Sequence, residues 1–313
     1  MNTNQDTGWL KKSPYDRFNY FIAGKVDRYK TLLQTIEKLG LYSAVIAVAG
    51  NKHIFIFPPW HKKSRPATGN PFPFIGQSPN MLVAHYDRVD GSPGANDNSI
   101  AVFHLLNTAI LMTAQNIDNW IIVFTDKEEL TSGESLESQG SFTLAQKLMS
   151  WGYEKAKIYN FDACGTGDTF IFSTLTDSVL GNNESPNIQK VKGDLYKLRN
   201  HALQTANNLR MEKMLLAPTP FCDDMGFLRA GFAVQTITML PTEEAAQFEE
   251  ILRKYPEFPK LLISGEIKTS PERRHLPATW KNINTPADTI HRLTPQYFDP
   301  LIKFIIELCR PPI

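Results

Sequence analysis

Short apolar runs alternate with longer amphipathic stretches along most of this chain. Such short runs are typical of buried strands, whereas apolar residues that recur every three or four positions indicate helices. The pattern predicts strands at residues 44–49, 53–57, 81–86, 120–125, 157–161, 169–173 and 233–239. It predicts helices at residues 25–40, 99–114, 142–151, 195–209 and 296–309. Strands that alternate with helices favour an α/β fold with a mostly parallel sheet.

The first part of the chain departs from this alternation. Residues 44–49 and 53–57 are separated only by a short turn that contains glycine, which predicts a β-hairpin. We therefore expect one edge of the sheet to be antiparallel. Residues 58–80 are rich in Pro, Gly, Lys and Arg and predict a long loop, which in a compact domain is usually functional or mobile. No internal repeat or linker interrupts the chain, so we predict a single domain over residues 1–313.

The composition is that of an ordinary globular protein. Of 313 residues, 42% are hydrophobic and 21% are charged, which excludes a disordered chain. The 33 Lys and Arg residues oppose 32 Asp and Glu residues, so the formal net charge is only +1. A chain with so small a net charge has no global field that attracts nucleic acid or an acidic membrane. We therefore expect neither as a partner.

The cysteines and the N-terminal residues bear on the compartment. Cys164, Cys222 and Cys309 are widely spaced and form neither a CxxC pair nor a zinc-knuckle pattern. The N-terminal residues contain no apolar run of the length of a signal peptide. The longest apolar stretch, residues 44–49, is far too short to span a bilayer. We expect a cytoplasmic protein.

Side chains that can bind metal stand at the ends of predicted strands or just before a predicted helix. The carboxyl ends of the strands are where ligand sites of α/β sheets lie. A set of carboxylates with one imidazole suits Zn²⁺, and less often Mn²⁺ or Co²⁺. The candidates are His85, Asp87, Asp97, Glu128, Glu129 and Asp162.

Each of these motifs alone has a simpler interpretation. His85 and Asp87 could belong to a surface loop, and Asp97 with Asn98 could cap the next helix. The two adjacent glutamates could form a solvated turn. In the functional interpretation, one glutamate binds metal while its neighbour moves protons, and Asp87 fixes the tautomer of His85. Because all the motifs gather at one sheet edge, we favour the metal site.

The order of these motifs resembles the zinc-dependent exopeptidases. The most similar type is the bacterial leucyl-aminopeptidase family, of which the animal glutaminyl cyclases are a branch. That resemblance implies a three-layer α/β/α fold with a mixed, mostly parallel central sheet. The resembling segments, in family order, are MLVAHYDRVDGSPGANDNSIAV, FTDKEEL, Gln139-Gly140-Ser141, NFDACG, Cys222-Asp223-Asp224-Met225-Gly226-Phe227 and INTPADTI.

The resemblance implies a centre for two metal ions. Asp97 would bridge both ions, and His85 with Asp162 would complete one site. Glu129 would belong to the other site. Zinc is the metal that the family uses.

The resemblance also implies the catalytic groups. Glu128 would act as the general base, taking a proton from the attacking water and passing it to the leaving amine. Asp87 would orient His85. The activity implied is removal of the N-terminal residue from small peptides by a metal-activated water.

Two positions depart from the family pattern. Asn284 stands where the family has its last metal-binding His, and an amide oxygen is a poorer zinc ligand than imidazole. We therefore expect one tight zinc site and a second site that is weak or absent. Asp224 stands where the Ser-Asp-His element has its His. His275 or His291 could take the missing position, although both fit surface residues.

Three functions stay open at this stage. The aminopeptidase is favoured because the triad of His85, Asp97 and Asp162 is complete. A glutaminyl cyclase fits less well, since in that branch the single zinc uses the site that Asn284 weakens, although the extra residues after Glu129 resemble that branch. A non-catalytic binding protein with the same fold is the third possibility, because such relatives often lose a ligand.

Overall fold

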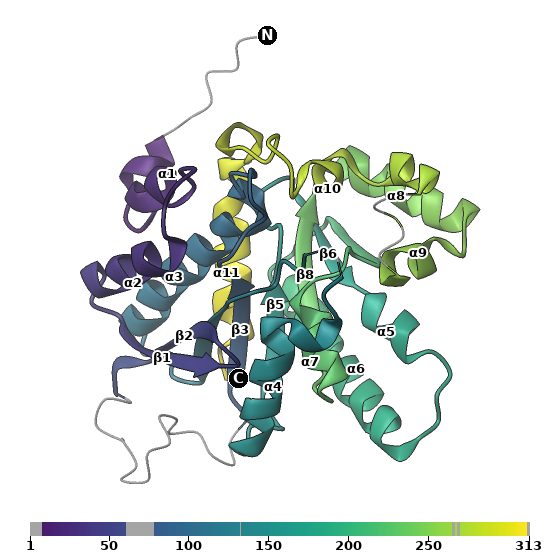
Figure 1. The fold of residues 1–313 in the computed structure, drawn as a ribbon, viewed down its shortest axis with the longest axis horizontal. Helices are drawn as coiled ribbons and strands as arrows, with labels where there is room; N and C mark the ends of the chain where they lie inside the picture. The colour runs from purple at the N-terminus through teal and green to yellow at the C-terminus, as the bar shows by residue number, and fades with distance from the viewer. Residues whose placement is uncertain (1–7, 61–77, 132, 265–266, 268–269, 312–313) are drawn as a thin grey trace.

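A computed structural model describes residues 8–60, 78–131, 133–264, 267 and 270–311. The strands are β1 (Tyr42–Val48), β2 (Asn51–Phe57), β3 (Asn80–His85), β4 (Trp120–Thr125), β5 (Lys157–Phe161), β6 (Thr169–Ser173), β7 (Met214–Ala217) and β8 (Val234–Leu240). In this described part, they form one eight-stranded sheet of order β1-β2-β4-β3-β5-β8-β6-β7 (Figure 1).

Helices cover both faces of the sheet (Figure 1). They are α1 (Phe18–Phe21), α2 (Arg28–Lys38), α3 (Ile100–Ala114), α4 (Gly140–Ser150), α5 (Leu175–Leu180), α6 (Pro186–Asn208), α7 (Asp223–Arg229), α8 (Thr242–Lys254), α9 (Phe258–Ser264), α10 (Ala278–Asn282) and α11 (Phe298–Leu308). Helices α2, α3, α6 and α11 contribute to the core on one face, and α4 to the core on the other. This is the three-layer α/β/α arrangement that was expected.

The alternation of side chains within the strands builds these two cores. Leu82 and Ala84 of β3 contact the core beneath α3 and α11, whereas Met81 and Val83 contact the core beneath α4. Every residue of β3 and β4 is buried. Strands covered on both faces are therefore continuous apolar runs, which is why the sequence pattern revealed them.

The predicted pairing is largely confirmed. β3 is parallel to both β4 and β5, and β5 is parallel to β8. The predicted hairpin is present, since β1 and β2 are antiparallel and lie at one edge. Next to the other edge strand, β7, strand β6 runs antiparallel to β8, which we did not predict. The short connection between β5 and β6 reverses the chain direction, because it contains no helix to carry the chain back.

Several elements in the second half were missed or shortened. Helix α6 begins at Pro186 rather than at residue 195. Ile188 and Val191 continue the apolar spacing of Leu195 towards the N-terminus, a signal that the sequence analysis did not use. Strand β7 and helices α5 and α7 to α10 were not predicted. Helices α8, α9 and α10 lie together over one end of the sheet (Figure 1).

Two sequence predictions lie partly beyond these observations. Residues 61–77 of the predicted loop at 58–80 are outside the described residues. That residues 1–313 form a single domain stays a prediction. In the part of the chain that is described, no helix combines the length and the apolar character needed to cross a bilayer.

Candidate metal centre

His85 is the last residue of β3, and its ring points into a cluster of carboxylates. Its Nε2 atom lies 3.0 Å from Asp97 Oδ1 and 3.8 Å from Asp162 Oδ1. Ligand atoms of these three residues all lie within 4.8 Å of one another. His85 is only 1% exposed, so the surface-loop interpretation is wrong for this residue.

The donor set of this cluster fits a metal ion. Neither ring nitrogen of His85 makes a hydrogen bond of acceptable geometry with any described residue, although carboxylate oxygens surround the ring. Buried polar atoms without hydrogen bonds are rare, and they call for an explanation. One imidazole nitrogen that faces two carboxylates is the ligand chemistry of zinc. Burial opposes protonation of His85, but Asp162, Asp87 and Asp97 raise its pKa well above the ordinary value.

Asp87 holds the back of the site together. Its Oδ1 atom lies 3.4 Å from Nδ1 of His85, and its carboxylate accepts hydrogen bonds from the amides of Glu128 (3.1 Å) and Glu129 (3.0 Å). Burial acts against ionisation of Asp87, but these interactions outweigh it and hold the pKa below its usual range. Asp87 therefore connects the end of β3 to the chain that follows β4.

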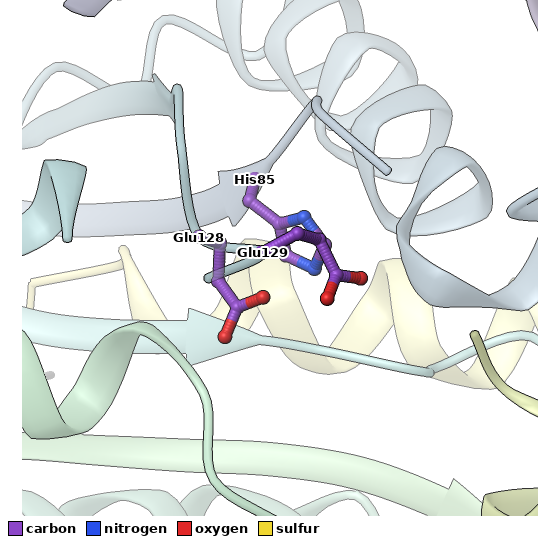
Figure 2. Close-up of side chains that lie close together, drawn as sticks. All are labelled: His85, Glu128 and Glu129. Carbon is purple, nitrogen blue, oxygen red and sulfur yellow. The ribbon is translucent and has the colours of Figure 1, made fainter. Parts of the chain in front are cut away.

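Glu128 and Glu129 follow β4 on a turn in which Lys127 has a positive φ of 58°. Their side chains converge with that of His85 beyond the end of β3, as Figure 2 shows, and ligand atoms of the three lie within 4.8 Å of one another. Glu128 is 7% exposed, which contradicts a solvated turn. Burial, and then the charge of Glu129, raises the pKa of Glu128 well above its ordinary value. A bound cation would oppose this repulsion.

The segment before α3 does not cap that helix, contrary to the simpler interpretation. The N-cap residue of α3 is Ser99, whereas Asp97 has non-helical φ and ψ angles of −115° and 92°. The side chain of Asn98 donates to the carbonyl of Phe161 (2.8 Å) and accepts from the amide of Ala163 (3.3 Å). The segment is therefore fastened to the end of β5, and the carboxylate of Asp97 is left to face His85.

Asp288 supports Asp97 from the far end of the sequence. Its carboxylate accepts hydrogen bonds from the backbone amides of Asn96 (2.8 Å) and Asp97 (3.0 Å). Burial, and then the charge of Asp97, raises the pKa of Asp288 to about 7. We assigned no role to Asp288 from the sequence, although it lies in the closing segment INTPADTI that carried the resemblance.

Arg28, at the start of α2, is a second residue that the sequence analysis missed. Its guanidinium is buried over the ring of Phe21 at 4.3 Å and donates to Oγ of Ser99 (2.6 Å). Burial, and then the charge of Arg88, lowers the pKa of Arg28 to about 9. A sequence signal existed, since Arg28 precedes Leu32 by one helical turn and therefore lies on the apolar face of the helix.

Asp223 and Asp224, at the start of α7, lie fully buried near the site. Asp223 accepts from the hydroxyl of Thr125 (2.5 Å), and burial raises its pKa to about 7. Asp224 accepts from the hydroxyl of Thr236 (2.9 Å), and burial raises its pKa to about 6. Asp224, which stands where the family has its His, is thus held by the hydroxyl of Thr236 in β8.

The acidic cluster opens into a cavity of about 540 Å³. Asp97, Glu128, Glu129 and Asp162 all line this cavity, and so does Asn284. Asn284 has a positive φ of 60°. Neither His275 nor His291 is among the described residues that line the cavity, so neither takes the place of the missing histidine there.

The model of one protein family, described as Peptidase family M28, matches residues 75–308. This range contains every site residue discussed above except Arg28. A comparison with curated protein sequences gives no significant match.

Solved structures of low sequence identity share the fold. A glutaminyl cyclase from Porphyromonas gingivalis matches with 17% identity and a TM-score of 0.57, covering 94% of both chains. A leucine aminopeptidase precursor from Bacteroides thetaiotaomicron matches with 16% identity and a TM-score of 0.57, covering 94% of this chain and 93% of the other. The chain spans only 48% of a zinc aminopeptidase from Bacillus subtilis, with a TM-score of 0.49.

Proposed function

We propose, from the premise that this chain belongs to peptidase family M28, that it is a zinc exopeptidase that removes the N-terminal residue from small peptides. The observation that carries the proposal is the convergence of His85, Asp97 and Asp162 beside a separate buried carboxylate, Glu128. A metal site alone would suit a binding protein. A hydrolytic reaction also needs a general base next to the metal, and Glu128 offers a carboxylate outside the triad for this role.

His85, Asp97 and Asp162 would hold the tighter zinc ion. Asp97 and Glu129 would contribute to a second, weaker position, where Asn284 replaces a histidine. Zinc in such a site supplies Lewis-acid chemistry, because it polarises the peptide carbonyl and makes water a better nucleophile near neutral pH. Asp87 keeps the His85 ring in the orientation that leaves Nε2 for the metal.

Glu128 is the proposed general base. Among the described residues, the one side-chain donor to its Oε1 atom is Nε2 of Gln139 at 3.4 Å, so the carboxylate is available to a water in the cavity. It would take the proton as the water oxygen bonds to the carbonyl carbon. It would then pass this proton to the amide nitrogen as the C–N bond breaks, so that the products are an amino acid and a shortened peptide.

A glutaminyl cyclase is the second candidate. The observation in its favour is that two solved glutaminyl cyclases match this chain over 94% of both lengths. Against it stands Asn284, because the resemblance gives that branch a single zinc held by the site that Asn284 weakens. Incubation with an N-terminal Gln peptide should therefore produce no pyroglutamate above the uncatalysed background. Enzymatic pyroglutamate formation would reverse this ranking.

Two measurements test the proposed function. Elemental mass spectrometry of the purified protein should find about one tightly held zinc ion per chain. Hydrolysis of fluorogenic amino-acid amides should fall by roughly 10²- to 10⁴-fold in Glu128→Gln, the range of general-base catalysis, while the tight zinc is retained. Glu137→Gln, on an exposed neighbouring turn, is the matched control and should keep full activity. A metal-free, inert wild type would instead support the non-catalytic relative.

A further inference from the structure

The cavity beside the metal centre carries charges of opposite sign on different walls. Its acidic residues come from the ends of strands and from the segment before α3. Arg273 lines the same cavity from the turn Pro271–His275, which precedes α10. It is the one basic side chain among the described residues that line the cavity. The resemblance and the proposed chemistry use none of the residues of this turn.

The turn that carries Arg273 is fastened on both sides. Ser270 caps it by accepting from the amide of Glu272 (3.1 Å), and Leu276 after it is buried. The neighbouring helix α10 is held to α8, because the amide of Thr279 donates to the carboxylate of Glu244 (2.8 Å). The buried ring of Trp280 packs against the core at its other end. The fold therefore sets the backbone position of this turn, and the exposed side chain of Arg273 extends from it along the cavity.

The guanidinium has unused hydrogen-bonding capacity. Its Nη2 atom donates to the carbonyl of Lys281 at 3.3 Å, and with the described residues it makes no other hydrogen bond or ion pair. A guanidinium carries five N–H donors and stays protonated, and its planar fork fits a carboxylate bidentately. Arg273 thus offers the cavity a site for an anionic oxygen pair.

Much of the rest of the cavity lining is apolar, and it includes Phe221, Leu262, Ile263, Leu276 and Trp280. The cavity volume of about 540 Å³ is in the range of pockets that enclose a small ligand. A ligand that matches this cavity offers a scissile amide to the acidic residues, apolar side chains to the apolar lining and a negative group to Arg273.

We propose that Arg273 binds the C-terminal carboxylate of the substrate, so that the preferred substrates are di- and tripeptides with apolar side chains. This inference rests on the proposed function for the orientation of the peptide. An acidic N-terminal side chain is the less favourable alternative, because it would enter beside Asp97, Glu128, Glu129 and Asp162, which repel it. The carboxylate at the far end of a short peptide avoids that repulsion.

The test compares Leu-Leu with Leu-leucinamide, which differ only at the C-terminal carboxylate. In the wild type, kcat/KM should be roughly 10- to 100-fold higher for Leu-Leu, the worth of a hydrogen-bonded charge pair. Arg273→Ala should lose this preference by turning over Leu-Leu more slowly, with Leu-leucinamide unchanged. Arg273→Lys keeps the positive charge but not the planar fork, so its preference for Leu-Leu should lie between those of the wild type and Arg273→Ala. Arg274→Ala is the control and should keep the preference, because Arg274 is exposed like Arg273 but does not line the cavity.

Binding separates this inference from the proposed function. Calorimetry would use a Leu-Leu analogue in which methylene replaces the scissile carbonyl, in its acid and amide forms. Arg273-dependent preference for the acid form without any turnover would support the inference and refute the peptidase. Turnover with equal use of acid and amide, or a preference that survives Arg273→Ala, would overturn the inference alone. An Arg273-dependent preference for N-terminal Glu amides would overturn it in favour of an acidic side chain.

Discussion

His104 should make the stability of the protein fall in mild acid. Its ring is 1% exposed, lies 4.5 Å from the ring of Phe298 and has Nδ1 2.7 Å from the hydroxyl of Tyr15. Burial lowers the pKa of His104 from 6.5 to about 3. Because the folded state holds this ring neutral, its contribution is complete above pH 6.5 and is lost as the pH falls from there towards 3.

The magnitude follows from these two pKa values. In the unfolded chain at pH 5, the protonated form of His104 is about 30 times more populated than the neutral form. This ratio corresponds to roughly 2 kcal/mol in favour of unfolding. At pH 7 the same contribution is only about 0.2 kcal/mol. The free energy of unfolding in urea should therefore be measured at pH 7 and at pH 5. Its decrease between the two pH values should be about 2 kcal/mol larger in the wild type than in His104→Gln.

A matched control exists in the same chain. His201 has Nδ1 2.7 Å from the hydroxyl of Tyr159, but it is only half-buried. His201→Gln should remove much less of the pH dependence than His104→Gln. An equal loss of stability between pH 7 and pH 5 in the wild type and in His104→Gln would refute the reasoning.

Three further predictions concern the site and its support. Asn284→His should tighten a second zinc ion at least tenfold in a calorimetric titration, and unchanged binding would mean that position 284 does not reach the metal. Asp288→Ala removes the acceptor that holds the backbone of Asp97, and charged hydrogen bonds contribute about 1.5–3 kcal/mol each, so zinc affinity should fall roughly tenfold or more. A Cβ atom at Gly140 would lie 1.7 Å from a backbone oxygen, so Gly140→Ala should lower the melting temperature sharply. In the control Gly193→Ala, where a Cβ atom would meet nothing within 4 Å, the exposed helix should be unchanged or more stable.

The sequence revealed the centre of the fold because that centre is built from largely buried elements. Strands β3, β4 and β5 and helix α3 are mostly apolar, and a buried apolar run leaves the same signal wherever it occurs. Strand β7, at the sheet edge, is only partly buried and gave no such signal.

The candidate ligands could also be predicted from the sequence. His85 ends β3, Glu128 and Glu129 follow β4, and Asp162 follows β5. The carboxyl ends of parallel strands meet at one edge of the sheet, independent of the loop conformations. Polar residues at the ends of predicted strands were therefore a sufficient signal that these side chains lie together. Asp97 follows no strand, and its local context also fitted a helix cap, so it was the motif resemblance that implied its role as a ligand.

The sequence by itself thus determined the α/β class, the parallel centre of the sheet and the group of residues that can bind metal. Only the tertiary structure decided what surrounds that group. Asp288 meets the amide of Asn96 across 192 positions, and Arg28 meets Ser99 across 71. Arg273 reaches the cavity from a turn outside the sheet. Contacts between distant segments depend on how whole elements pack, and neither hydrophobic periodicity nor local spacing records that packing.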